Sequence, residues 1–294
     1  MTSATHSPEA WAHFIRKTRT FFEEKGFLEV FTPSLVPAGA FENALDTLKV
    51  RSSLGEAELH TSPEMEMKVL LAEVKRPIFQ VCKCFRDDPN TAIHFTEFNM
   101  LEFYRPFETY ETTRKDIRDL LETLAHKSFS FLEVSIEEVF KKYTGIPLSE
   151  LHSTSLLLEA AKKIGIQDLS EKESWEDIFF RIMIEKIETQ LDPNTPTLIF
   201  DYPASVSTLS QPKNGFWGER FELFWHGMEL CNGATELLSK ELLKTRYEFE
   251  SSERARLGKT PHPFPDRMYQ ALHSLPPCSG VAVGLDRLFW ALQR

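Results

Sequence analysis

The chain has 294 residues, and with 41% of them hydrophobic it can bury a full core, which we expect to form one domain over 1–294. The balance of 34 Lys+Arg against 44 Asp+Glu gives a net charge of -10, which argues against a protein that follows a nucleic-acid backbone over a wide surface. Residues 1–10 hold no apolar run typical of a signal peptide, and no stretch reaches membrane-spanning length, so we expect a cytoplasmic protein without membrane contact.

The N-terminal third begins with a helix and continues with strands. Ser7 and Pro8 are typical of a helix cap and a first-turn proline, and Gly26 is expected to end the helix. Its apolar stripe consists of Trp11, Phe14, Ile15, Thr18 and Phe22. Strands are predicted at 27–31, 78–85 and 97–104, the last two forming a long hairpin.

The middle of the chain is predicted to be helical from about residue 110 to 191, with capped helix starts at Ser135 and Ser174. Further strands are predicted at 198–202, 220–225 and 228–231, with His226-Gly227 as a tight turn, then a helix at 236–257 and a last strand at 281–283. Strict alternation of strands and helices is missing, which favours an α+β fold with a mainly antiparallel sheet.

Four cysteines occur, at positions 82, 84, 231 and 278, without C-x-x-C spacing. The spacing therefore suggests neither a zinc site nor a disulfide framework. Cys82 and Cys84 would share one face of a strand, where buried thiols are the favoured interpretation.

The 78–104 hairpin carries the first candidate site. The chain contains neither G-x-x-x-x-G-K-S/T nor G-x-G-x-x-G, which excludes the common phosphate-binding loops. Alternation places Phe98, Glu102 and Tyr104 on one face, near Arg86 at the end of the preceding strand. These groups suit a purine and its phosphate; the alternative is that the aromatic rings are core and Arg86 is a surface charge.

Glutamates set in apolar strands form the second candidate site. Glu222, Glu229 and Glu236 are spaced by seven residues, and Arg287 follows Gly284 near the C-terminus. A carboxylate in an apolar strand needs a cation, which Mg²⁺ on a triphosphate or a ligand ammonium would supply. Ion pairing with Arg220 or Arg287 is the alternative.

Three segments, in this order, resemble the three motifs of class II aminoacyl-tRNA synthetases, and most closely those of the lysine-specific branch. They are Gly26 to Pro33, Phe85 to Phe98, and Gly280 to Arg287. The resemblance implies an α+β class II synthetase catalytic fold, with a mainly antiparallel sheet flanked by helices. It also implies a homodimer formed through the helix of the first motif and its apolar stripe; the alternative is that Trp11, Phe14 and Phe22 are intramolecular core.

The resemblance starts at the first helix of the catalytic domain, so no N-terminal anticodon-binding OB domain is expected. This size, with Tyr202 to Ser205 and Cys278 to Ala282, is similar to the elongation factor P--(R)-beta-lysine ligase family, which consists of truncated lysyl-tRNA synthetase paralogues. That likeness implies ATP-dependent activation of a lysine-type amino acid, (R)-beta-lysine, and its transfer to a lysine of elongation factor P. tRNA is not expected as a partner.

Roles at the ATP site follow from the resemblance by position. Arg86 and Arg287 would be catalytic, the first at the α-phosphate and the second, reached through Gly284, at the adenine or the γ-phosphate. The other implied ATP contacts are Asp88, His94, Phe98, Glu222 and Glu229, the last two also holding Mg²⁺. These groups would stabilise charge during an in-line displacement at phosphorus.

For the amino acid, Ser62-Pro63-Glu64 is informative, since aspartate- and asparagine-specific relatives usually carry Gln after Ser-Pro, whereas Glu suits an ammonium group. The implied substrate-binding residues are Ser62, Glu64, Glu102, Tyr104, Asn232, Glu236 and Ala282, with Glu236 at the side-chain amine. Ala282 stands where lysyl-tRNA synthetases often have glycine, and its methyl group would favour a β-amino acid by about 1 to 3 kcal/mol.

The sequence departs from the family pattern at three places: Asp88 for the usual Glu, Phe95-Thr96 for a residue followed by Pro, and Ala234 for Phe. Two alternatives therefore stay open. The acceptor would be tRNA or a small molecule, or the chain would be a catalytically silent regulatory paralogue.

Overall fold

The computed structural model describes residues 7–53, 55–88, 91, 95–170 and 172–294. The chain forms two compact units. The first unit comprises Met1–Lys127 and Gly233–Arg294, and the second unit comprises Ser128–Asn232. Strand β12 (Met228–Thr235) carries the chain from the second unit back into the first.

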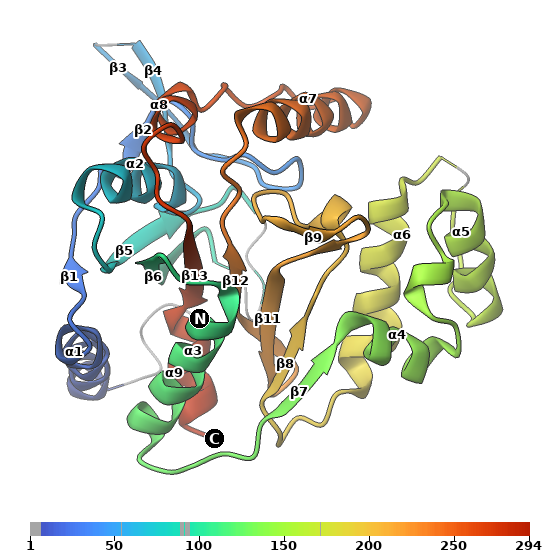
Figure 1. Cartoon of the computed structure of the whole chain (residues 1–294), viewed down its shortest axis with the longest axis horizontal. Coiled ribbons are helices and arrows are strands. Elements are labelled where there is room, and N and C mark those ends of the chain that lie inside the picture. The colour runs from blue at the N-terminus through green and yellow to red at the C-terminus, as the bar shows by residue number, and fades with distance from the viewer. Residues whose placement is uncertain (1–6, 54, 89–90, 92–94, 171) are drawn as a thin grey trace. The chain divides into compact units, whose positions relative to one another are not determined.

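The main sheet of the first unit has the strand order β1-β5-β6-β13 (Figure 1). These strands are β1 (Leu28–Glu29), β5 (Ile78–Phe85), β6 (Glu97–Pro106) and β13 (Cys278–Gly284). β1 runs parallel to β5, whereas the β5–β6 and β6–β13 pairs are antiparallel. A small antiparallel sheet has the order β2-β4-β3 and consists of β2 (Leu35–Val36), β4 (Gly55–Leu59) and β3 (Lys49–Ser52).

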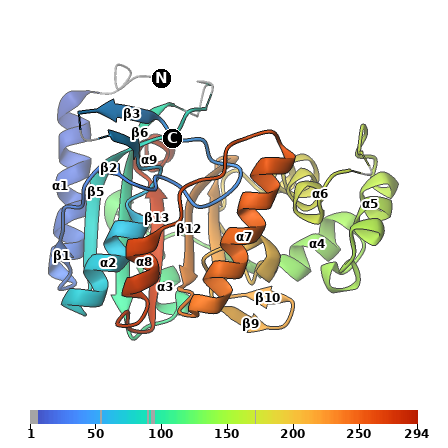
Figure 2. The same cartoon turned by 90° about the horizontal axis from the view of Figure 1, so that it is seen from above.

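Helices of the first unit pack on its main sheet and on its loops. They are α1 (Pro8–Glu24), α2 (Glu64–Val74), α3 (Tyr110–Ala125), α7 (Lys240–Arg256), α8 (Asp266–Ala271) and α9 (Leu285–Leu292). Helix α1 starts where predicted, because the Ser7 hydroxyl accepts a hydrogen bond from the Ala10 amide and proline occupies the first turn. Figure 2 shows α2 and α8 side by side in front of β5 and β13.

The apolar stripe of α1 packs on the main sheet and on α9. The Phe22 ring centroid lies 5.1 Å from that of Phe79 on β5 and 4.8 Å from that of Phe103 on β6. The ring of Trp11 meets that of Phe289 on α9 edge to face at 5.2 Å. The stripe is therefore core of its own chain, which is one of the two roles that its residues allow.

The second unit combines a short sheet with a helical cluster. Its strands are β7 (Leu132–Ser135), β8 (Thr197–Phe200), β9 (Pro212–Asn214), β10 (Trp217–Gly218) and β11 (Arg220–Trp225). Its α-helices are α4 (Ile136–Thr144), α5 (Thr154–Lys163) and α6 (Trp175–Ile182), and shorter helical turns occur at Leu148–Glu150, Met183–Ile187, Glu188–Gln190 and Ala204–Val206. β8 pairs in parallel with β7 and antiparallel with β11. The helices pack around one apolar cluster that includes Phe140, Ile178 and Phe179.

Several local predictions are confirmed. Ser135 and Ser174 each cap a helix through a reciprocal capping box. The predicted tight turn joins β11 to β12, and both His226 and Gly227 have positive φ, as the favoured two-residue hairpin turn requires.

Some predicted elements differ from the structure in extent or type. The helix expected from Glu236 begins only at Lys240, because Ser239 caps it and the Glu236 amide donates instead to the Cys278 carbonyl at 2.9 Å. The predicted 27–31 strand is reduced to β1, and the presumed helical region contains strand β7, which pairs with β8. In each case tertiary pairing overrides local propensity.

The fold class is confirmed as α+β with a mostly antiparallel sheet flanked by helices. None of the helices in the described ranges has the length and apolar character needed to cross a membrane.

Candidate active site

The polar face of the first unit's sheet is built by strand register. On β5 and β6, Gln80 lies opposite Glu102 and Cys84 opposite Phe98. On β6 and β13, Tyr104 lies opposite Gly280 and Glu102 opposite Ala282. Side chains two residues apart share a face. The prediction that Phe98, Glu102 and Tyr104 share one face is therefore confirmed, and Ala282 joins them.

A buried lysine from helix α2 bridges two of the predicted substrate-binding glutamates. The Lys68 ammonium lies 2.5 Å from a carboxylate oxygen of Glu64 and 2.5 Å from one of Glu236. Lys68 is only 1% exposed. The Ser62 hydroxyl accepts a hydrogen bond from the Glu64 amide at 3.3 Å, which fixes the start of α2. We call Glu64, Glu102 and Glu236, together with Lys68 and Tyr104, the carboxylate cage.

Glu102 is the least satisfied member of the cage. Its Oε1 accepts a hydrogen bond from the Tyr104 hydroxyl at 2.6 Å. Its Oε2 is buried and has no hydrogen-bond partner among the residues that the structure describes. An unpaired buried carboxylate oxygen is costly. A cationic ligand at this oxygen would remove that cost.

Burial and mutual repulsion set the ionisation of the cage. Burial, with the Glu64 carboxylate, raises the pKa of Glu102 well above its usual range. Burial also raises the pKa of Glu236 to about 7, although Lys68 acts in the opposite direction. Burial opposes the charged form of Lys68, but Glu236 and Glu64 outweigh it and raise the pKa of its ammonium. The cage therefore holds a firmly charged cation among carboxyl groups that are ready to lose protons when another cation arrives.

Gly280 forms the floor of the cage. A Cβ atom at this position would lie 2.2 Å from Tyr104 Cε1 and 2.6 Å from Glu236 Oε1. Separations this short do not occur between non-bonded atoms, so glycine keeps the space in which the two polar side chains meet.

Arg86, just beyond β5, lies against the predicted adenine-stacking ring. Its guanidinium carbon is 5.1 Å from the ring centroid of Phe98, within the range of a cation–π contact. The buried Arg86 Nε has no hydrogen-bond partner in the described part of the chain. Asp88 is half-buried beyond it, and the predicted residue His94 lies outside the described residues.

Glu42, which the sequence patterns did not single out, interacts electrostatically with Glu64 of the carboxylate cage and with Arg86. Burial and the Glu64 carboxylate raise its pKa to about 7, whereas Arg86 acts to lower it. The charge state of Glu42 therefore depends on both Arg86 and Glu64.

The β13-to-α9 junction holds the other predicted catalytic arginine. Gly284 ends β13 and caps α9, and Arg287 is half-buried in its first turn. The neighbouring Asp286 carboxylate accepts hydrogen bonds from the backbone amide of Asn99 at 2.6 Å and from its side-chain amide at 2.9 Å. These bonds tie the start of α9 to β6.

The second unit carries the remaining predicted residues, around Glu222 on β11. Glu222 Oε1 lies 2.6 Å from the Arg220 guanidinium, and its Oε2 accepts the Tyr202 hydroxyl at 2.6 Å. Arg220 Nε also donates to the Asn232 side-chain oxygen at 3.2 Å. The ion pair anticipated as the alternative for Glu222 is therefore present, and Asn232 faces Arg220.

Two further carboxyl groups of the second unit, those of Glu188 and Glu229, share an electrostatic environment with Glu222. Burial and the Glu222 carboxylate raise the pKa of Glu188 to about 7. Glu229 is half-buried and acts on Tyr202 together with Glu222. Oxygen donors of this kind fit Mg²⁺. Glu188 was missed because it lies in a segment predicted only as helix.

Lys68, Glu42 and Gly280 were likewise missed as site residues. For Lys68 a signal existed, since it follows Glu64 by four residues and such pairs meet on a helix. Glu42 lies in a loop, where no periodic pattern indicates which side chains share a face. Gly280 was identified only as the first residue of the third motif and not as a residue of the site.

Comparison with known proteins identifies the family of the chain. The model of the family "tRNA synthetases class II (D, K and N)" matches residues 8–294. The chain is 38% identical over 290 residues to an "Elongation factor P--(R)-beta-lysine ligase homolog" of Aquifex aeolicus, covering 96% of this chain and 93% of that protein. It is 35% and 33% identical to proteins named "Elongation factor P--(R)-beta-lysine ligase" from Avibacterium paragallinarum and Vibrio atlanticus, each match covering 94% of this chain and 88% of the relative.

These matches extend over nearly the whole chain, and the residues matched by the family model include the three motifs. The family implies the use of ATP. The chain belongs to the elongation factor P--(R)-beta-lysine ligase family of amino acid ligases, within the class II tRNA synthetases.

Proposed function

We propose that the protein activates a lysine-type amino acid, (R)-beta-lysine, with ATP and transfers it to a lysine side chain of elongation factor P. The observation that carries this proposal is the charge of the carboxylate cage. The carboxylates of Glu64 and Glu236 contact the single ammonium group of Lys68, and Glu102 lies within its electrostatic influence. Once ionised, the cage has two negative charges left for its ligand.

A diamino acid satisfies those two charges, because lysine and its β-isomer each carry two ammonium groups. One ammonium group of the ligand binds Glu102 at Oε2, which otherwise has no hydrogen-bond partner among the described residues. The other ammonium group binds Glu236 and Glu64 and partly replaces Lys68 as their partner. Asparagine and aspartate lack a second ammonium group, so they would leave a buried carboxylate unpaired. This mismatch excludes them more strongly than shape alone would.

ATP lies on the Arg86 side of the site in this proposal. Phe98 stacks on adenine with Arg287, and Arg86 pairs with the α-phosphate through its buried, unpaired Nε. Asp88, His94 and Gly284 complete the nucleotide contacts. Glu222 and Glu229 hold Mg²⁺, which supplies positive charge to the phosphates.

The reaction has two steps. A carboxylate oxygen of the amino acid attacks the α-phosphorus of ATP, the bond to the bridging oxygen breaks, and pyrophosphate leaves. The amine nitrogen of the acceptor lysine then attacks the acyl carbon, AMP leaves, and the amine loses its extra proton. The residues of the chain position the reactants and stabilise charge, and no covalent enzyme intermediate is required.

We also propose a homodimer that uses the exposed apolar side chains around β1, the edge strand of the main sheet. Phe31 is 77% exposed, and Leu28 and Leu35 are also exposed. Exposed apolar groups beside an unpaired edge favour association. Phe31→Asp should shift the mass measured by light scattering from dimer to monomer; an unchanged dimer mass would contradict this interface.

Intact mass spectrometry of the acceptor tests the proposed function. Purified protein, ATP and (R)-beta-lysine are incubated with elongation factor P, and a parallel reaction contains tRNA. The expected result is one added lysyl mass on elongation factor P and none on tRNA. Modification of tRNA alone would replace the protein acceptor, and formation of no acyl product would favour the regulatory alternative.

A further inference from the structure

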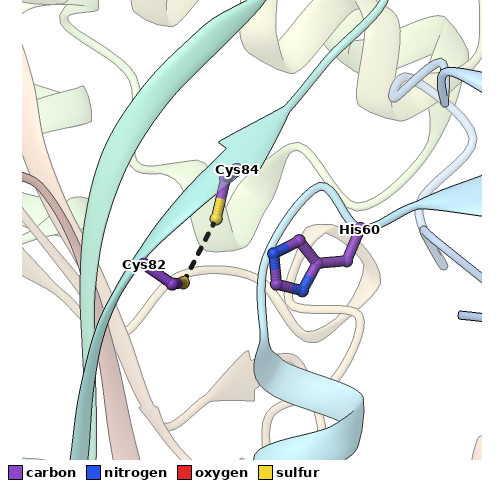
Figure 3. A group of neighbouring side chains, drawn as sticks. All are labelled: His60, Cys82 and Cys84. Atoms are coloured by element: carbon purple, nitrogen blue, oxygen red, sulfur yellow. Dashed lines mark hydrogen bonds between the residues drawn. The ribbon is translucent and has the colours of Figure 1, made fainter. Parts of the chain in front are cut away.

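Two thiols and one imidazole meet on the polar face of the first unit, beside the carboxylate cage but outside it. Figure 3 shows His60 with its ring edge turned toward Cys82 and Cys84 on β5. One donor atom from each of the three residues lies within 4.8 Å of the others. None of them has a role in the proposed activation or transfer.

Strand geometry places the sulfur atoms together. Cys82 and Cys84 alternate with the outward Lys83 and so share one face, and their Sγ atoms are 3.8 Å apart. From the neighbouring strand β6, the Met100 thioether sulfur lies 3.8 Å from Cys84 Sγ. Three sulfur atoms therefore line this part of the face.

The imidazole is fixed in a buried position. The His60 carbonyl accepts the Phe85 amide at 3.1 Å, and His60 Nε2 lies 2.8 Å from the Lys83 carbonyl. His60 is 1% exposed, and its Nδ1 has no hydrogen-bond partner among the described side chains and backbone. The imidazole therefore meets the two sulfur atoms as a buried ring that is held at one nitrogen by a backbone carbonyl.

The sulfur separation matches that of a metal site. Two thiolates on one tetrahedral ion, with bonds of about 2.3 Å, lie about 3.8 Å apart. The imidazole needs a shift of about 1 Å to reach the same ion. A disulfide fits less well, because Cα atoms two residues apart on a strand are about 6.7 Å apart, at the upper end of the disulfide range.

We propose that His60, Cys82 and Cys84 bind a thiophilic d¹⁰ ion, Zn²⁺ or Cu⁺. Thiolate and imidazole ligands suit both ions, and the nearby thioether of Met100 offers a fourth donor that favours Cu⁺. The proposal concerns the free protein, and it does not depend on the proposed ligase activity.

Metal titration of the reduced, chelator-treated protein, without ATP or amino acid, tests the proposal. Zn²⁺ affinity is measured by competition with a chromophoric chelator and Cu⁺ affinity with a Cu⁺-specific one. The variants are Cys84→Ser and His60→Gln, and the control is Cys231→Ser, a buried thiol of the second unit. Thermal melting of each variant shows whether it is folded.

The expected result is one ion per chain. Both ligand variants should weaken binding by at least about 100-fold, since even the partners of ligands contribute ten- to hundredfold, whereas the control variant should bind like the wild type. Met100→Leu should weaken Cu⁺ binding only. The same affinity in the wild type and both ligand variants would overturn the proposal.

Alkylation of the wild-type protein gives a second test that needs no variant. Cys82 is partly exposed, so it should react with iodoacetamide in the metal-free protein and be protected by one equivalent of the ion. An unchanged alkylation rate would also contradict the site.

Discussion

The two faces of the strands β5, β6 and β13 differ in what they contribute. One face presents Phe79 and Phe103, both fully buried under Phe22 of α1. The other presents Gln80, Glu102 and Tyr104. Every second residue of the same strand therefore serves packing, and the residues between them serve binding.

The energetic balance also differs between the faces. Aromatic burial stabilises the first face. The second face buries acids whose pKa values are raised, and one carboxylate oxygen on it has no partner in the described part of the protein. These buried acids lower the free energy of unfolding until a cationic ligand pairs with them. Substitutions on the aromatic face should therefore change mainly the stability of the protein, and substitutions on the polar face mainly its activity.

The largest expected effect is on stability, from Phe103→Ala on the aromatic face. Removing this ring, which is 0% exposed, should lower the free energy of unfolding by about 3–5 kcal/mol. Urea denaturation measures the loss. The KM for the amino acid should stay close to the wild-type value under conditions where the variant is folded, and a large rise in KM would show that the two faces are not separable.

Arg86→Ala should have the largest effect on chemistry. Loss of a preorganised cation at the α-phosphate should reduce the rate of ATP-pyrophosphate exchange by about 10²- to 10³-fold. The matched control is Arg51→Ala, which removes an exposed arginine paired with Glu56 and should leave exchange unchanged. Equal rates in the two variants would remove Arg86 from the site.

Glu102→Gln tests the polar face one residue away from Phe103. Loss of one buried charge partner should cost about 2 kcal/mol of amino acid binding, and so raise the KM for the lysine-type substrate about 30-fold. The KM for ATP should change little. The unfolding free energy should stay equal or rise, because a buried acid with an unpaired oxygen is removed; a clear loss of stability would contradict the comparison.

The pH dependence should follow Glu236, whose pKa is raised by burial from 4.5 to about 7. Between these values the folded protein holds a proton that the unfolded chain has lost, so stability falls as pH rises through this window. Affinity for a dicationic substrate should rise over the same window. Glu236→Gln should weaken both trends, and Glu56→Gln, at an exposed position, should leave them intact; equal pH profiles in all three proteins would exclude Glu236.

The smallest effect is expected from Ala282→Gly. The methyl group of Ala282 lies opposite Glu102, so its removal opens space beside the carboxylate that receives an amine. The ratio of kcat/KM for α-lysine to that for (R)-beta-lysine should rise about 10-fold, as expected for one methyl group. A ratio unchanged within error would assign the preference to another residue.

Much of this arrangement was predictable from the sequence. The period-two pattern of residues 78–104 identified the hairpin and the shared face of Phe98, Glu102 and Tyr104, because alternate side chains of a strand point to the same face of the sheet. Cap residues located the starts of α1, α4 and α6 for the same local reason.

Features that depend on long-range contacts were not predictable in this way. Glu236 was assigned to a helix, but its backbone pairs with Cys278, 42 residues later. The bridge between Lys68 and Glu236 and the approach of His60 to Cys82 and Cys84 join distant segments. Composition and spacing do not encode such contacts without the fold.

ATP-pyrophosphate exchange with the wild-type protein tests the central claim most directly, because it measures activation without any acceptor. The panel contains α-lysine, both enantiomers of beta-lysine, ornithine, arginine and aspartate. A cage that keeps two negative charges for its ligand predicts exchange with the diamino acids, strongest with (R)-beta-lysine, and none with aspartate. Exchange with aspartate, or with none of the panel, would contradict the account.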